Sequence, residues 1–190
     1  HICTGRKEEG EGEWKEVSDS WNYFPGEEIE VRCYTNCQNP KLYVNGKEVA
    51  DTQKVDSSEL GYDTWIVPFE AGKIEAVAEN VHHVLETVNA PVQIQLEEAG
   101  CEDIVQIELT VLDDMGRRVI SDQSEIHVAI EGDCEYLGMD NGDAADVTEY
   151  RSHYRHCLEG KMMIYLRKLS DEKVKVTASN PKLRKAQIEV

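Results

Sequence analysis

The chain has 190 residues, with 20 lysine and arginine residues against 38 aspartate and glutamate residues, so its formal net charge at pH 7 is −18. This charge argues against a nucleic-acid backbone or an anionic membrane surface as a partner, because both attract positively charged surfaces. No apolar run approaches the roughly 18 residues that a membrane-spanning helix requires. The length suits one large domain or two domains of ordinary size.

Residues 1–28 combine many charges with several aromatic side chains and are predicted to form an irregular linker. If the rings of Trp14, Trp21 and Tyr23, together with Trp65, were exposed and coplanar, they would form a carbohydrate-binding platform, because a flat apolar ring suits the CH face of a sugar. Such rings also pack a linker onto its neighbouring domain. We favour the packing role.

Residues 29–35 alternate between apolar and polar side chains, which is the period of a half-buried strand. A second short strand is expected at residues 41–44. It runs into Asn45-Gly46, and both residues tolerate a positive φ, so a two-residue hairpin turn is predicted, with residues 47–50 as the returning strand.

This region resembles the immunoglobulin-like domain that follows the catalytic barrel in bacterial family 2 glycoside hydrolases, the β-galactosidase group. The resemblance rests on Trp21, Asn22, Gly26, Ile29, Val31, Tyr34, Thr35, Asn36, Leu42, Asn45, Gly46, Lys47, Trp65, Val67, Pro68, Glu70 and Gly72. The sequence departs from the family pattern at Tyr23, where a second tryptophan is usual.

The rest of the first half continues with short strands. Residues 65–69 contain Pro68, which has no N–H for a sheet ladder, so this strand is expected to be an edge strand or a bulged one. Residues 73–80 alternate again, and residues 82–88 are expected to form the last strand of a first sandwich. The Asn89-Ala90-Pro91 segment marks the predicted domain boundary.

The second half is predicted to be another sandwich, with strands near 92–97, 105–111, 162–167, 174–179 and 185–190 and a turn at 114–116. It resembles the second immunoglobulin-like domain of the same enzymes. The matching residues are Glu131, Gly132, Leu137, Gly138, Asp140, Asn141, Gly142, Asp143, Arg155, Gly160 and Lys161. The predicted fold is therefore all-β, with two consecutive immunoglobulin-like β-sandwich domains at 1–89 and 90–190.

The Asp140-Asn141-Gly142-Asp143 segment concentrates oxygen ligands that suit calcium. Asp140, Asn141 and Asp143 are the candidate metal ligands, although the spacing is not that of an EF-hand. The alternative, which we favour, is that these side chains shape a loop through hydrogen bonds to its own backbone. The nearby His153, His156 and Cys157 lack the spacing of a zinc site.

Six cysteines are spread along the chain without a zinc-site pattern. They are Cys3, Cys33, Cys37, Cys101, Cys134 and Cys157. A disulfide from Cys157 to Cys101 or Cys134 would suit a sandwich, but we favour free and mostly buried thiols. Free thiols favour a cytoplasmic location, with a periplasmic or secreted one as the alternatives.

The chain starts with His1 and not with methionine, so we expect a fragment of a longer protein. In the family that it resembles, both catalytic glutamates lie in the upstream barrel, so we assign no catalytic residue here. The resemblance implies a parent that hydrolyses terminal β-linked sugars with retention, and a non-catalytic tail that supports the barrel or an oligomer. A carbohydrate-binding module and a cell-surface adhesin with immunoglobulin-like repeats are the alternatives.

Overall fold

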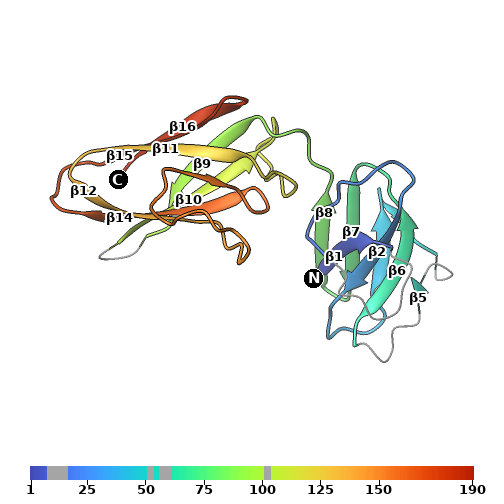
Figure 1. The fold of residues 1–190 in the computed structure, drawn as a ribbon. Coiled ribbons are helices and arrows are strands. Elements are labelled where there is room, and N and C mark those ends of the chain that lie inside the picture. Colours follow the sequence, from blue (N-terminus) through green and yellow to red (C-terminus); the bar gives the residue numbers. More distant parts are fainter. Residues whose placement is uncertain (8–16, 51–53, 56–60, 101–103) are drawn as a thin grey trace. The chain divides into compact units, whose positions relative to one another are not determined.

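The structure is a computed structural model that describes residues 1–7, 17–50, 54–55, 61–100 and 104–190. These residues contain sixteen strands, which confirms the predicted all-β fold (Figure 1). No helix among them has the length and apolar character needed to cross a membrane. The chain forms two compact units, His1–Thr87 and Val88–Val190.

The first unit has two four-stranded sheets, with strand orders β1-β2-β6-β5 and β4-β3-β7-β8. Its strands are β1 (Ile2–Arg6), β2 (Glu28–Cys33), β3 (Lys41–Val44), β4 (Lys47–Glu48), β5 (Lys54–Val55), β6 (Asp63–Pro68), β7 (Lys73–Ala78) and β8 (Val81–Glu86). The two sheets pack face to face around one core, as in a β-sandwich.

The predicted hairpin turn is present between β3 and β4. Asn45 and Gly46 have φ angles of 50° and 79°, so both adopt the left-handed conformation that a tight two-residue turn requires. The Asn45 side chain also donates to the Ala71 carbonyl at 3.1 Å and accepts from the Lys73 N–H at 2.9 Å. The turn is thereby fixed to the start of β7.

The prediction of an irregular linker over residues 1–28 is wrong for its first residues. Ile2–Arg6 form β1, which pairs antiparallel with β2 from Ile2–Cys33 to Arg6–Ile29. Ile2 and Thr4 are fully buried. The five-residue stretch is too short to show a clear period, and its partner lies more than twenty residues away, so local sequence contained little signal.

Strand β6 is also not the edge strand that Pro68 suggests, because it lies between β2 and β5. Pro68 is the last residue of β6, whereas the described residues of β5 pair with Thr64 and Trp65, nearer the start of the strand. Among the described residues, the proline nitrogen therefore faces no ladder bond to β5.

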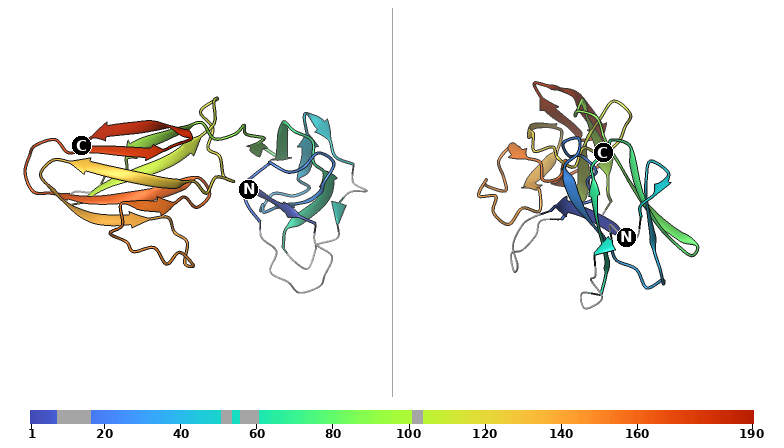
Figure 2. Two further views of the ribbon diagram at one scale, coloured as in Figure 1. Left: turned by 45° about the horizontal axis from the view of Figure 1, so that its top comes forward. Right: turned by 90° about the vertical axis from the view of Figure 1, so that its right-hand side faces the viewer.

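The second unit contains one continuous series of eight strands in the order β12-β14-β10-β9-β16-β15-β11-β13. These strands are β9 (Gln93–Glu98), β10 (Val105–Leu112), β11 (Glu125–Glu131), β12 (Cys134–Asp140), β13 (Tyr154–His156), β14 (Lys161–Lys168), β15 (Lys175–Asn180) and β16 (Leu183–Glu189). A single parallel pair, Arg184–Gln93, joins β16 to β9, and the two groups of four strands form the layers of a sandwich (Figure 2).

The core of the second unit is almost entirely aliphatic. The predicted alternation of β10 is confirmed, because Ile107, Leu109 and Val111 are fully buried between the layers. Strand β14 adds Ile164 and Leu166, which are also fully buried. Burial on this scale contributes about 1.5–3 kcal/mol for each large aliphatic side chain, so these strands provide much of the unit's stability.

The turn after β10 is organised by Asp113, which the sequence did not single out. This fully buried carboxylate accepts backbone N–H bonds from Asn89, Met115 and Arg117 at 2.9–3.0 Å. The Arg117 guanidinium adds a bond of 2.7 Å. Burial opposes ionisation, but these donors prevail and hold the pKa of Asp113 well below its usual range.

The thiols of Cys3, Cys37, Cys134 and Cys157 are free, so the suggested disulfide between Cys134 and Cys157 is absent. Cys157 is 3% exposed in the core of the second unit. Burial raises its pKa to about 12, because the thiolate would lose its hydration. This thiol is therefore a packing group and not a nucleophile.

Candidate functional site

The aromatic residues proposed for sugar stacking do not form an exposed platform. Trp21 is fully buried and Trp65 is 2% exposed, while Tyr23 is half-buried and Trp14 lies outside the described residues. The Trp21 ring packs edge-on against Phe69 with centroids 5.0 Å apart, and its Nε1 donates to the Glu70 carbonyl at 3.1 Å. The sandwich uses these rings as core, because its two sheets need large apolar side chains to fill the space between them.

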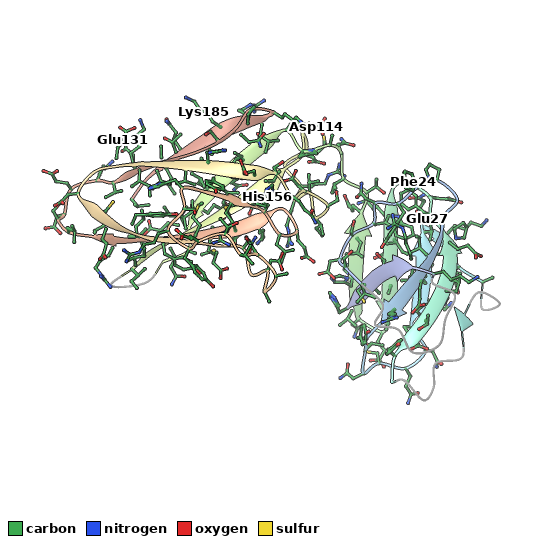
Figure 3. The ribbon with its side chains drawn as sticks, in the orientation of Figure 1. Phe24, Glu27, Asp114, Glu131, His156 and Lys185 are labelled. Carbon is green, nitrogen blue, oxygen red and sulfur yellow. The ribbon has the colours of Figure 1, made fainter. Side chains whose placement is uncertain are left out.

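Among the described residues of the first unit, the aromatic ring with the largest exposed fraction is that of Phe24, and Tyr34 is exposed to a smaller extent, at 41%. Phe24 is 73% exposed at the end of the unit (Figure 3). It begins a turn in which Glu27 N–H donates to the Phe24 carbonyl at 3.0 Å, and the Glu27 carboxylate accepts from the Phe24 N–H at 3.0 Å. A single isolated ring is a common surface feature and does not define a site.

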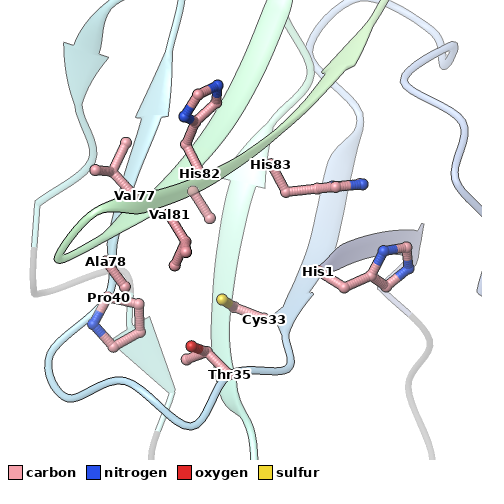
Figure 4. A pocket seen from close by; sticks show the side chains of 10 residues that line it. His1, Cys33, Thr35, Pro40, Val77, Ala78, Val81, His82 and His83 are labelled. Atoms are coloured by element: carbon pink, nitrogen blue, oxygen red, sulfur yellow. The ribbon is translucent and has the colours of Figure 1, made fainter.

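The hollows of the first unit are limited. A pocket of about 50 Å³ lies beside β8, with Cys33 at its base and Pro40, Val81 and His83 in its wall (Figure 4). Small-molecule sites usually occupy about 300 Å³ or more, so this pocket is too small for a sugar ring. A cleft of about 310 Å³ borders Trp65, whose 2% exposure leaves almost no ring face for stacking.

The most elaborate polar arrangement lies in the second unit, in the loop of residues 141–153 that joins β12 to β13. The predicted metal ligands lie at its start. Asp140 accepts from the Gly142 N–H at 3.1 Å, Asn141 from the Asp143 N–H at 2.9 Å, and Asp143 from the Ala145 N–H at 2.8 Å. These oxygens therefore hold successive backbone turns.

A calcium ion would have to compete with those bonds. In the part of the chain that the structure describes, no three His, Cys, Asp or Glu side chains are arranged to hold a metal ion. His153 stacks on Tyr136 with ring centroids 4.6 Å apart, whereas His156 is exposed and bonds to the Gln123 carbonyl at 2.9 Å. Calcium binding remains a prediction.

The centre of the loop is a buried ion pair between Asp146 and Arg155. Arg155 is 2% exposed, and its two terminal nitrogens donate to Asp146 Oδ2 at 2.6 Å and to the Thr148 carbonyl at 2.7 Å. Asn141 donates to the same Asp146 oxygen at 2.9 Å. The Arg155 Nε is buried and has no hydrogen-bond partner among the described residues.

The electrostatics of this pair follow from those donors. Hydrogen bonds from the Thr148 hydroxyl and N–H, together with the Arg155 guanidinium, lower the pKa of Asp146 to about 2. The carboxylate is therefore ionised at neutral pH and compensates the buried guanidinium. Arg155 matches the family pattern, but the sequence showed no reason for its burial, because its partner lies nine residues earlier on a loop.

A second set of contacts fixes the far end of the loop. Met139 N–H donates to the Tyr150 carbonyl at 2.8 Å, and Tyr136 donates its hydroxyl to the Ser152 carbonyl at 2.6 Å. Gly138 has a φ of 142°, and a Cβ there would lie 2.5 Å from the Tyr150 carbonyl oxygen. The glycine at this position thus lets the loop pass directly over β12.

The arrangement of residues 141–153 can present side chains in a fixed geometry. Apart from Arg155 Nε, the polar groups of the buried ion pair are engaged in hydrogen bonds within the loop, so they are held as structural contacts. Its exposed side chains include Val147 and Tyr150, which are 97% and 66% exposed. A rigid loop with apolar side chains at its surface is typical of a contact site and not of a catalytic centre.

Comparison with known proteins assigns the family. Residues 91–189 match the family described as glycoside hydrolase family 2 C-terminal domain 5, and residues 26–82 match a domain of unknown function (DUF4982). The first match covers more than half of the chain. The chain therefore belongs to glycoside hydrolase family 2 and carries its C-terminal domain 5.

Several known proteins are similar to the chain in sequence or in fold. The chain is 27% identical over 183 residues to beta-galactosidase BoGH2A of Bacteroides ovatus, which covers 90% of this chain and 21% of that protein. A family 2 glycosyl hydrolase from Bacteroides cellulosilyticus has the same fold, with a TM-score of 0.87, 23% identity, and coverage of 100% of this chain and 28% of that one. A family 2 beta-glucuronidase shows a TM-score of 0.73 at 21% identity, over 90% of this chain and 19% of its own. The chain thus spans about a fifth of the length of its curated relative.

Proposed function

We propose that this chain is the non-catalytic C-terminal region of a family 2 glycosidase that hydrolyses terminal β-linked sugars with retention. The proposal rests on one observation: 90% of this chain aligns with only 21% of the length of a β-galactosidase. Retaining glycosidases use two carboxylates held about 5–5.5 Å apart. We place both in a catalytic barrel outside this chain.

The role that we propose for the two sandwiches is to support the barrel. Their cores are built from β-ladders with closely packed side chains, and such units deform little. Many of their carboxylates pair with neighbouring cations, as Glu108 does with Lys161 at 2.8 Å and Glu135 with Arg167 at 2.7 Å. Carboxylates held in such ion pairs support the proposal of a structural role over a catalytic one.

The curated relatives include both a β-galactosidase and a putative β-glucuronidase, so both sugars are candidate substrates. We favour a neutral β-galactoside, since the β-galactosidase aligns over nearly the whole chain at the higher identity.

The alternative is that the two sandwiches support a homo-oligomer and not the barrel. In that case the isolated chain should show a concentration-dependent mass in analytical ultracentrifugation.

The test is hydrolysis of p-nitrophenyl β-galactoside and β-glucuronide by two proteins. One is this 190-residue chain, and the other is the longer protein encoded by the same gene. We expect turnover by the longer protein only. Turnover by the isolated chain would overturn the non-catalytic assignment, and an inactive longer protein would overturn the glycosidase assignment.

A further inference from the structure

The loop of residues 141–153 places an aliphatic side chain almost wholly in solvent. Val147 is 97% exposed, and Tyr150, three residues later, is 66% exposed. The loop, orange in Figures 1 and 2, projects from the second sandwich. An exposed valine gains nothing from packing within the chain, so the conformation of the loop must be held by other contacts.

Those contacts lie beneath the exposed side chains. The Arg155 guanidinium bonds to Asp146 and to the Thr148 carbonyl, on either side of Val147, and its central carbon lies 5.4 Å from the centre of the Tyr150 ring. One face of that ring therefore covers the buried charge. Burying an ion pair carries a desolvation cost that an apolar pair would avoid, yet here it fixes both ends of the Val147 segment before any partner is bound.

The chemistry of the exposed side chains favours a protein partner over a sugar. Sugar sites are concave and place polar groups around a ring face, whereas this loop projects and carries an aliphatic tip. Asp143 and Glu149 are exposed on either side of Val147, whereas the exposed Arg151 is already paired with Glu135 at 3.7 Å. A complementary surface would therefore be an apolar hollow with a basic rim.

A second copy of this chain fits poorly as that surface. A symmetric contact through the loop would bring Asp143 and Glu149 of one copy towards the same residues of the other. Each copy also carries a net charge of −18, which opposes association.

We propose that Val147 and Tyr150 dock into an apolar hollow with a basic rim on the catalytic part of the same polypeptide. This inference rests on the proposed function, which supplies that catalytic part. The docking would anchor the second sandwich to the enzyme through a preformed loop, and the tyrosine and valine would provide most of the buried apolar area.

Site-specific photo-cross-linking in the longer protein tests the contact. Val147→p-benzoylphenylalanine should cross-link, on irradiation, to peptides outside residues 1–190 of the same polypeptide. The matched control is Leu169→p-benzoylphenylalanine in the β14–β15 turn, because Leu169 is also exposed, at 61%, and should give no such product. Cross-linked dimers, or a yield no higher than at position 169, would overturn the proposal.

A charge substitution separates docking from folding. Val147→Asp should leave the melting temperature of the isolated chain unchanged, because the side chain has no partner to lose there, but should lower the melting temperature of the longer protein. Leu169→Asp should lower neither. Equal melting of the longer protein with and without Val147→Asp would contradict docking. Hydrolysis assays on the unmodified longer protein report separately on the proposed function, since cross-links can form whether or not it cleaves glycosides.

Discussion

The two units share a sandwich architecture but place their aromatic side chains differently. The first unit buries Trp21, Trp65 and Phe69 at 0–4% exposure. The second unit has no tryptophan or phenylalanine, builds its core from aliphatic residues and methionine, and exposes Tyr150 and Tyr154. The first unit thus fills its core with large aromatic rings, although Phe24 is exposed, whereas the core of the second unit needs no tryptophan or phenylalanine.

Each unit also has a buried or nearly buried ion pair, and the two pairs differ in the elements that they connect. Glu30 and Arg32 lie two residues apart on β2, with a contact of 2.7 Å, so their pair stabilises a strand that the sheet already holds. Asp146 and Arg155 connect a loop to β13 at 2.6 Å. The second pair therefore fixes the conformation of the loop, which the hydrogen-bonded strand ladders alone would not fix.

The largest expected effect tests the aromatic core. Trp21→Ala removes a fully buried ring and its hydrogen bond, so we expect a loss of about 4 kcal/mol in the free energy of unfolding. Urea denaturation would measure this loss in unfolding free energy, and hydrogen exchange of the β2 and β6 amides would locate it in the first unit. Phe24→Ala is the control, because that ring is 73% exposed and its removal should cost less than about 0.5 kcal/mol. Similar losses for both variants would contradict the assignment of Trp21 to the core.

The second prediction concerns the loop. Asp146→Ala leaves the Arg155 guanidinium buried without its counter-charge, for an expected loss of about 3 kcal/mol in unfolding free energy. The double variant Asp146→Leu with Arg155→Met removes both charges and should lose less than the single variant. Chemical denaturation of both proteins checks this order. If the double variant were the less stable one, charge compensation would not be the main role of the pair.

The third prediction is a loss of stability in acid. The pKa of Asp146 is lowered to about 2 from 3.8, so its contribution is fully present above about pH 4 and is lost as the pH falls towards 2. Its size is about 2 kcal/mol. Asp113 shifts in the same direction, which extends the loss to lower pH. Thermal melts from pH 5 to pH 2 would show the effect, and Asp146→Asn should flatten the profile; an unchanged profile would count against the ion pair.

The smallest expected effect concerns calcium. Because oxygens of Asp140, Asn141 and Asp143 already accept backbone N–H bonds, we expect millimolar calcium to raise the melting temperature by less than about 1 °C. Differential scanning calorimetry with and without a chelator measures this shift. A larger rise, reversed by the chelator, would establish a metal site in the loop and change the account of its rigidity.

Local sequence patterns were reliable where a single strand or turn decided the outcome. The alternation in β7 and β10 and the Asn45-Gly46 turn could be predicted because side-chain period and positive φ are properties of a few adjacent residues. The Ile2–Arg6 strand and the interior position of β6 could not, because each depends on which distant strand lies beside it. The role of Arg155 could not be predicted either, because its partner Asp146 lies nine residues earlier on a loop without a periodic pattern.

By itself, the sequence of this protein determined the all-β class, the hairpin and the membership in family 2, because these follow from periodicity, turn chemistry and motif spacing. Only the tertiary structure decided which aromatic rings were covered and which remained in solvent. Burial depends on the opposing sheet, and a tryptophan has the same local sequence signature whether it fills a core or binds a sugar. The buried Asp146–Arg155 pair likewise exists only after the loop has folded back onto β13.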